Sequence, residues 1–361
     1  MRKVHIHSLP EKAVLAKPIF TEAGNILLGL GVQLTERLIN RLEALGIDYI
    51  FIEDSLTDDI IPNDVISDRT RKKAVDLVHS TLTNMINHTQ IKGAKTTSSP
   101  IGSSYREAFS SIIDDLLSQN EMIVNLNQIN SLDSYMFHHA VNVAVLSGII
   151  GISLGYNRNQ LLELGTGALM FDIGMTKIPN EIWNKKGVLT EEEKKILRNH
   201  AIEGYQILKS QHDISLLSAH VALQHHERYN GEGYPRGLKG EAIHEYARIV
   251  AIADVYDALT SPRLHRARYS PSEAIEYLFA NGNSLFDLKI LEKFAKHIAI
   301  YPVATTVILS TNQMGVVTKV HQDAINRPII RILKESNGDP VNPPYEIDLK
   351  QHLDIVIKSQ L

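Results

Sequence analysis

The stretch HHERYNGEGYPRGLKG, from His225 to Gly240, is the part of the 361-residue sequence that decides the fold. Two adjacent imidazoles stand directly before a segment rich in glycine and proline. Gly231, Gly233 and Pro235 indicate a tight loop, because glycine allows positive backbone φ angles and proline fixes its own φ. The stretch therefore combines candidate metal ligands with a constrained loop.

Four segments on either side add further candidate ligands. They read FHHAVNVAVLS, DIG followed two residues later by KIP, NHAIEGYQIL and RIVAIADVYDALTS. Imidazole and carboxylate ligands suit iron, manganese, zinc or nickel, and here each would come from a different helix facing a shared interior. By spacing alone, a scattered His or Asp is more often a surface or core residue. The candidate ligands are His139, Asp172, His200, His225, His226 and Asp254.

Composition sets limits on the class of protein. The sequence is 43% hydrophobic and 22% charged, with a net charge of -4, which gives no support for a duplex-DNA binder. It has 0 cysteines, so disulfides, thiolate nucleophiles and Cys-based metal sites are excluded. No apolar run precedes Pro10, and the most apolar window, from Val141 to Leu154, is too short to span a bilayer. We therefore expect a cytoplasmic protein without membrane contact.

Residue patterns divide the chain into four parts. The runs VLAKPIF, ILLGLG and YIFIED around one helix, which begins at Thr35 and ends at Gly46, predict a small α/β module. A helix and a linker rich in Ser, Thr, Gly and Pro follow, and then a long helix-rich region. The runs VATTVILS, MGVVTKV, RPIIRILK and LDIVIK predict a β-rich end. The predicted parts are residues 1–66, 67–104, 105–300 and 301–361.

Some helix boundaries carry specific signals. Thr190 with Glu193 predicts a capping box, and Ser270 followed by Pro271 predicts another helix start. A helix from Ser67 to His88 has an apolar stripe along one side. That stripe either mediates dimerisation or packs on the helix's own domain, and the sequence leaves both possibilities open.

The HHERYNGEGYP stretch with its flanking segments resembles the HD-GYP family of cyclic di-GMP phosphodiesterases. Its eleven residues agree with the signature HHExxxGxGYP at every defining position, and the resemblance covers roughly residues 130–275. It implies a mainly α fold, an HD-type helical bundle carrying the GYP loop, with the α/β module and the β-rich segment beside it. It also implies metal-dependent opening of cyclic di-GMP to the linear dinucleotide and on to GMP.

The resemblance assigns roles to individual residues. Asp172 is the catalytic carboxylate that bridges two divalent transition metals, iron or manganese, which together activate a hydroxide. His139 and Asp254 complete one metal position, and His200, His225 and His226 hold the other. Arginine suits phosphate and guanine because its planar fork pairs bidentately with either. The implied substrate-binding residues are Tyr234, Asp257, Arg263 and Arg266.

Three positions depart from the family pattern. Phe171 stands where the HD motif has its His, so the first metal position loses a ligand and holds its ion weakly. Met175 replaces a Lys that would neutralise phosphate charge. Tyr135 replaces the Glu of members with a third metal, so we expect no third metal.

Two neighbouring side chains are poor substitutes for the missing groups. His138 points about 100° away from the next residue on a helix, and we expect it to face solvent. Lys177 points to a different helix face from Met175.

Two classes of function therefore remain open. The missing His and Lys slightly favour a binding module without turnover, which is a cyclic di-GMP sensor or a scaffold whose GYP loop contacts other signalling proteins. The alternative is an active phosphodiesterase with one well-held and one weak metal. A homodimer is possible in either case, and neither class involves duplex DNA.

Overall fold

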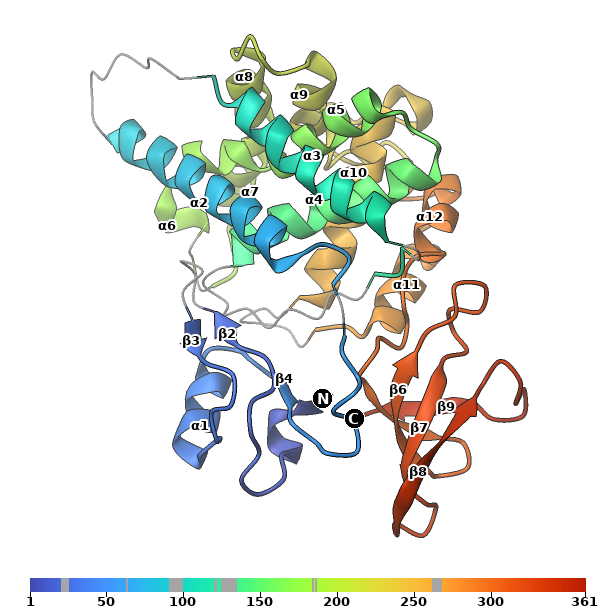
Figure 1. Ribbon diagram of the computed structural model, residues 1–361. Coiled ribbons are helices and arrows are strands. Elements are labelled where there is room, and N and C mark those ends of the chain that lie inside the picture. Colours follow the sequence, from blue (N-terminus) through green and yellow to red (C-terminus); the bar gives the residue numbers. More distant parts are fainter. Residues whose placement is uncertain are drawn as a thin grey trace.

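The computed structural model of the chain describes residues 1–20, 26–62, 64–90, 100–119, 122–124, 135–183, 185, 187–261 and 268–361. Helices α2 to α12 gather into one bundle, and the N-terminal module and the C-terminal sheet lie next to each other on one side of that bundle (Figure 1). The expected fold class, a mainly α bundle with an α/β module and a β-rich C-terminal segment, is confirmed.

The bundle is built around α4, which packs against α5 and α10. Another close pair, α8 and α9, packs beside the 3-10 segment Ile173–Lys177. The helices of this part are α2 (Asp68–Gln90), α3 (Gly102–Ser118), α4 (Tyr135–Ser153), α5 (Arg158–Leu169), α6 (Asn180–Trp183), α7 (Glu191–Arg198), α8 (His200–Lys209), α9 (Leu216–Gln224), α10 (Glu245–Thr260), α11 (Pro271–Ala280) and α12 (Leu288–Ala295).

The central helix corrects two expectations. The prediction that its apolar window is too short for a membrane is wrong by length, since Met136–Ser153 is long and apolar enough to cross one. However, 78% of this stretch is buried inside the protein, as in the core helix of a bundle. The prediction that His138 faces solvent is also wrong: its side chain is buried, because neighbouring elements cover α4 on every side from this residue to Gly151.

The predicted helix signals are confirmed. Thr190 and Ser270 both form capping boxes, and Pro271 occupies the first turn of α11. The helix expected from Ser67 is α2, and its apolar stripe packs on its own bundle through buried side chains such as Val78 and Leu82. The helix α3 already begins at Gly102, within the predicted linker, most of which lies outside the described residues.

The N-terminal module consists of two small antiparallel sheets and one helix. β1 (Arg2–His5) pairs with β4 (Tyr49–Ile52), and β2 (Ile19–Phe20) pairs with β3 (Ile26–Leu28). α1 (Glu36–Ala44) begins after the predicted cap Thr35, whose hydroxyl accepts from the Leu38 N–H, and ends before Gly46, which has a positive φ. β1 is an additional strand ahead of the predicted runs.

The C-terminal part is one antiparallel sheet in the order β8-β7-β6-β5-β9. Its strands are β5 (Thr306–Leu309), β6 (Met314–Lys319), β7 (Ile329–Lys334), β8 (Pro340–Asp348) and β9 (Ile357–Gln360). The four predicted runs are found, but β8 is missing from the prediction because its sequence, PVNPPYEID, contains three prolines. Those prolines are tolerated because β8 lies at the sheet edge, where a strand needs fewer N–H donors.

The N-terminal module and the C-terminal sheet are joined directly. The Lys3 N–H donates to the Ala304 carbonyl at 2.8 Å, and the Arg331 guanidinium contacts both Asp59 and Glu346. They also share a small apolar core made of Ala16, Phe51, Ile60, Ala304, Val316 and Leu333. β1, and with it Lys3, is thereby held against the sheet.

Replacing Gly165 with alanine is expected to destabilise the bundle, because a Cβ there would lie within 2.1 Å of three ring atoms of Phe109. Phe109 is fully buried, so its ring can move only by disturbing its neighbours. We expect urea denaturation to show a loss of about 1–3 kcal/mol in the free energy of unfolding. Gly187→Ala is the control, since nothing lies within 4 Å of its added Cβ. Equal losses in both variants would contradict this packing argument.

Candidate metal centre

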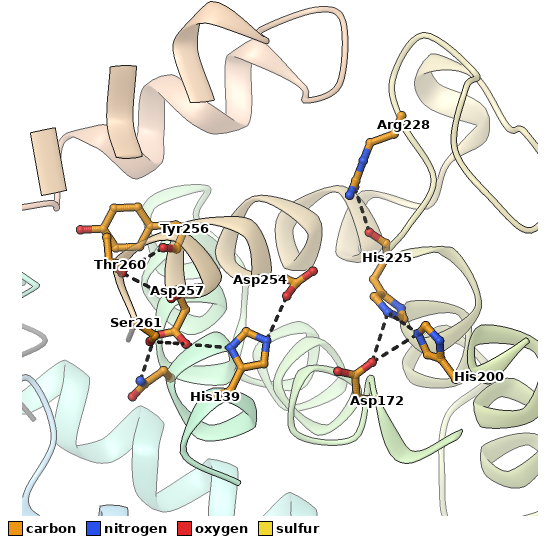
Figure 2. A network of polar contacts seen from close by, with 11 residues as sticks. His139, Asp172, His200, His225, Arg228, Asp254, Tyr256, Asp257, Thr260 and Ser261 are labelled. Carbon is orange, nitrogen blue, oxygen red and sulfur yellow. Dashed lines mark hydrogen bonds and ion pairs between the residues drawn. The ribbon is translucent and has the colours of Figure 1, made fainter. Parts of the chain in front are cut away.

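Four of the six predicted ligands meet between α5, α8 and α9. Asp172 lies just after α5, His200 is the first residue of α8, and His225 and His226 directly follow α9. Their ligand atoms all lie within 4.8 Å of one another, in the one such cluster among the described residues. Figure 2 shows three of them pointing toward one another. The structure thus brings together the residues that the family resemblance assigns to the second metal.

Close packing of two backbone segments brings Asp172 next to α8. A Cβ on Gly174 would come within 2.0 Å of the His200 carbonyl oxygen and 2.5 Å of the Gly204 nitrogen. Glycine therefore allows the DIG segment to approach the first turn of α8. Oδ1 of Asp172 and Nε2 of His200 consequently lie 3.4 Å apart.

Backbone carbonyls determine which nitrogen of two histidines carries the proton. Nδ1 of His200 lies 2.7 Å from the Leu197 carbonyl oxygen, and Nδ1 of His225 lies 2.9 Å from that of Ala222. Each Nδ1 therefore donates, which leaves each Nε2 as an acceptor. The two Nε2 atoms lie 3.3 Å apart, and they lie 3.4 and 3.5 Å from Oδ1 of Asp172.

Burial keeps two of these imidazoles in the neutral, metal-binding form. It lowers the pKa of His200, against the opposing charge of Asp172, and lowers the pKa of His226 well below its usual value. Burial raises the pKa of Asp172, but the neighbouring His225, His200 and His139 outweigh burial and lower this pKa to about 2. Neutral imidazoles and an ionised carboxylate are the protonation states that bind a metal.

The donor set fits a divalent transition metal. Three lone pairs face one point, and no donor among the described residues stands between them. A cation relieves this repulsion, and the carbonyls behind His200 and His225 orient the two rings as outer partners of metal ligands do. Imidazole with carboxylate suits iron, manganese or zinc, and does not distinguish among them.

His139 and Asp254 form a separate polar corner. Nε2 of His139 lies 3.0 Å from Oδ1 of Asp254, and its Nδ1 lies 2.7 Å from Oδ2 of Asp257. Asn142 donates from Nδ2 to Oδ1 of Asp257 at 2.9 Å, and the Asp257 side chain is almost fully buried. Both nitrogens of His139 therefore face carboxylates, so a proton on each nitrogen satisfies this corner from within the protein.

Phe171 lies between the two groups of ligands. It is 1% exposed, so its ring packs in the helical core. It meets the rings of His139 and His225 edge-on, with centroids 5.6 and 5.0 Å away. Apolar ring carbon therefore occupies the position from which an imidazole would offer a ligand.

Only some of the remaining positions that the sequence singled out lie within the described residues. Met175 is half-buried in the 3-10 segment after Asp172, and Lys177, the last residue of that segment, is exposed. The side chain of Tyr135 lies outside the described residues, as do Arg263 and Arg266. The roles assigned to these three residues stay predictions.

One buried carboxylate holds the GYP loop. Glu227, 2% exposed, accepts the N–H groups of Arg236 at 2.8 Å and Leu238 at 2.9 Å. A Cβ on Gly233 would lie 2.4 Å from the Glu227 Cα, so only glycine permits this approach. The loop brings the Tyr234 ring over His226, with centroids 4.7 Å apart. The loop is thereby fixed against the metal ligands.

Three residues that were assigned no role from the sequence also belong to the site. Glu227 and Asn142 had a signal available, since one is the third residue of HHExxxGxGYP and the other lies one helical turn after His139. Arg198, the last residue of α7, had none. Its guanidinium carbon lies 5.2 Å from the Tyr234 ring centroid, which places a positive charge beside the loop.

Comparison with known proteins agrees with this architecture. A family model described as an HD domain matches residues 113–290, and one described as a KOW domain associated with HD domain matches residues 306–361. A cyclic di-GMP phosphodiesterase of Pseudomonas aeruginosa is 32% identical over 244 residues, which are 66% of this chain and 59% of that protein. One of Thermotoga maritima is 31% identical over 240 residues, 66% of this chain and 65% of that protein.

A third relative matches a shorter stretch. The cyclic di-GMP phosphodiesterase response regulator RpfG of Xanthomonas campestris is 39% identical over 148 residues, covering 41% of this chain and 39% of that protein. The chain thus spans between 39% and 65% of the length of these three relatives.

Glu227→Gln is expected to loosen the GYP loop, because an amide presents an NH₂ group to one of two N–H donors. The loss of a charged acceptor should cost about 1.5–3 kcal/mol locally. Hydrogen exchange should show reduced protection of the Arg236 and Leu238 amides, with α4 unchanged. Glu232→Gln, on the exposed part of the same loop, is the matched control. Unchanged protection in Glu227→Gln would refute the role of this carboxylate.

Proposed function

Because the chain belongs to the HD-GYP family of HD-domain proteins, we propose that it binds cyclic di-GMP around a single divalent metal and hydrolyses it weakly or not at all. The observation that carries this proposal is Phe171. Its buried ring contacts both His139 and His225, at the position where the family's HD motif supplies an imidazole. We accordingly treat residues 105–300 as the nucleotide-binding domain of a four-part chain.

The single metal is assigned to Asp172, His200, His225 and His226. This cluster lacks an internal cation among the described residues, whereas His139 can carry protons on both nitrogens between Asp254 and Asp257. When bound, iron or manganese would supply a Lewis acid for a phosphate oxygen. A two-metal phosphodiesterase also needs the first position, and there Phe171 leaves three ligands, two of which pair with each other.

The groups on the nucleotide side are Tyr234, Arg198 and the two predicted arginines. Tyr234 covers His226, and burial raises the pKa of its phenol, so the phenol keeps its proton and can donate to a phosphate. Arg198 adds a charge that can pair with phosphate. Arg263 and Arg266 would add further cations, while Asp257 acts here as a positioning residue for His139.

Weak hydrolysis has a second cause besides the loss of one metal, which is the loss of a positive charge beside the phosphate. Three residues after Asp172, where the family has a Lys, this chain has Met175. The Met175 side chain cannot neutralise a phosphate oxygen. Lys177 is exposed at the end of the 3-10 segment and does not take that place.

The second candidate function is an active cyclic di-GMP phosphodiesterase. It is favoured by the retained cluster of one carboxylate and three imidazoles and by the names of the relatives. It requires a second metal to bind at His139, Asp172 and Asp254 without the fourth ligand. Metal content and turnover separate the two functions.

The full chain, loaded with Mn(II) or Fe(II) and dialysed, is expected to retain about one metal per chain by mass spectrometry. His225→Ala should lose that metal, because it removes one of the converging lone pairs. His220→Ala is the matched control on α9, since His220 contacts Gln224 and lies outside the cluster. Retention of about two metals by the unaltered chain would support the two-metal enzyme instead.

The double change Phe171→His with Met175→Lys is expected to create or raise hydrolysis of cyclic di-GMP by at least about tenfold, since it restores a ligand and a phosphate-neutralising charge. Chromatography of the linear dinucleotide measures this. Phe171→Leu with Met175→Lys controls for removal of the ring without a new ligand. If the unaltered chain turns over cyclic di-GMP as fast as the double variant, Phe171 and Met175 are not the defect.

A further inference from the structure

A cavity of about 630 Å³ lies where the N-terminal module, the helical bundle and the C-terminal sheet meet. The N-terminal module lines it with β1 and β4, the bundle with α4, α10 and the start of α11, and the C-terminal sheet with β9. The lining residues used below are Lys3, Tyr49, Asp257, Ser261, Arg268 and Lys358.

Two cations face this cavity without a carboxylate partner. The guanidinium carbon of Arg268 lies 4.0 Å from the Tyr49 ring centroid, and Nζ of Lys3 lies 5.4 Å from it. Within the described chain, neither side chain forms an ion pair or donates a hydrogen bond. By contrast, the buried Arg71 pairs with Asp64, and Arg248 pairs with Asp287. Lys3 and Arg268 are thus two adjacent cations that no carboxylate of the described residues pairs with.

Uncompensated cations in a protein interior are costly. Burial, helped by the charge of Arg268, lowers the pKa of Lys3 to about 7. Burial likewise lowers the pKa of Arg268, although Tyr49 and Asp48 oppose the shift. An anion placed between Lys3 and Arg268 would stabilise both charges.

The acidic side chains of the wall are mostly engaged elsewhere. Asp257 contacts His139 and Asn142, and Glu273 accepts from Ser270 in the capping box of α11. Asp48 lines the cavity but lies beyond ion-pair distance from Lys3 and Arg268. The cation pair therefore remains available to an external anion.

We propose that this cavity binds a phosphate-bearing small molecule of nucleotide size, at a site separate from the cluster of Asp172, His200, His225 and His226. Its volume falls within the range of about 300–1,000 Å³ for small-molecule pockets. Lys3 and Arg268 would hold the phosphate, and Lys358 would add charge at the rim, where it is exposed. Hydroxyl groups for the remainder of the ligand come from Thr260, Ser261 and Ser272.

The site lies behind His139 as seen from the metal centre. In Figure 2, Asp257, Thr260 and Ser261 are on one side of the His139 ring, and Asp172 with His200 and His225 is on the other. Asp257 lines the cavity and also contacts Nδ1 of His139. Because His139 and Asn142 line the cavity too, a ligand there would share these three wall residues with the polar corner while using different cations.

Calorimetry on the full chain in the presence of a metal chelator tests this site independently of the proposed metal function. The probes are 5′-AMP, pyrophosphate and, as an anion without phosphorus, citrate. We expect 5′-AMP and pyrophosphate to bind and citrate to bind much more weakly. No binding of either phosphate probe at millimolar concentration, or citrate binding as tightly as pyrophosphate, would overturn the proposal.

Arg268→Gln should weaken binding of 5′-AMP by at least about tenfold, because a charge-assisted contact is lost. Lys358→Glu, a change at the exposed rim of the cavity, should also weaken binding of 5′-AMP. This second variant tests the site even if the Arg268→Gln protein does not fold. Arg158→Gln, an exposed arginine paired with Asp114 on the bundle surface, is the charge-matched control. Binding that is unchanged in Lys358→Glu and in folded Arg268→Gln would place the ligand elsewhere.

Discussion

The convergence of three acceptors on one point is the constraint on which the site depends. Nε2 of His200, Nε2 of His225 and Oδ1 of Asp172 lie within 3.5 Å of one another, and backbone carbonyls fix both imidazoles with their protons on the far nitrogen. Lone pairs held this close repel unless a cation stands between them. The close approach at Gly174 makes the cluster part of the packing of α8, not a flexible surface arrangement.

The charges are balanced differently in the cluster at Asp172 and in the polar corner at His139. The cluster at Asp172 could hold a metal cation, whereas a protonated His139 can lie as the cation between Asp254 and Asp257. Phe171 lies between the two groups and puts apolar ring carbon where the HD motif has its His. The fold and the GYP loop are intact beside Phe171, and we propose that this one side chain removes the first metal position and leaves the cluster at Asp172 able to hold a metal.

Much of the fold and part of the site could be predicted from the sequence. Local signals predicted the capping boxes at Thr190 and Ser270, and the HHExxxGxGYP stretch contains two residues of the cluster that could hold a metal, His225 and His226. The burial of His138 could not be predicted, because it depends on elements that cover α4 from distant parts of the chain. The same holds for β8, whose prolines are acceptable only at a sheet edge, and for Arg198, which meets Tyr234 only through tertiary packing.

The central claim is that one metal position remains and that Phe171 has closed the other. Anomalous diffraction from crystals grown with Mn(II) locates bound metal directly, independent of turnover. The account predicts one peak, surrounded by Asp172, His200, His225 and His226. A second peak of similar height between His139, Asp172 and Asp254 would contradict it.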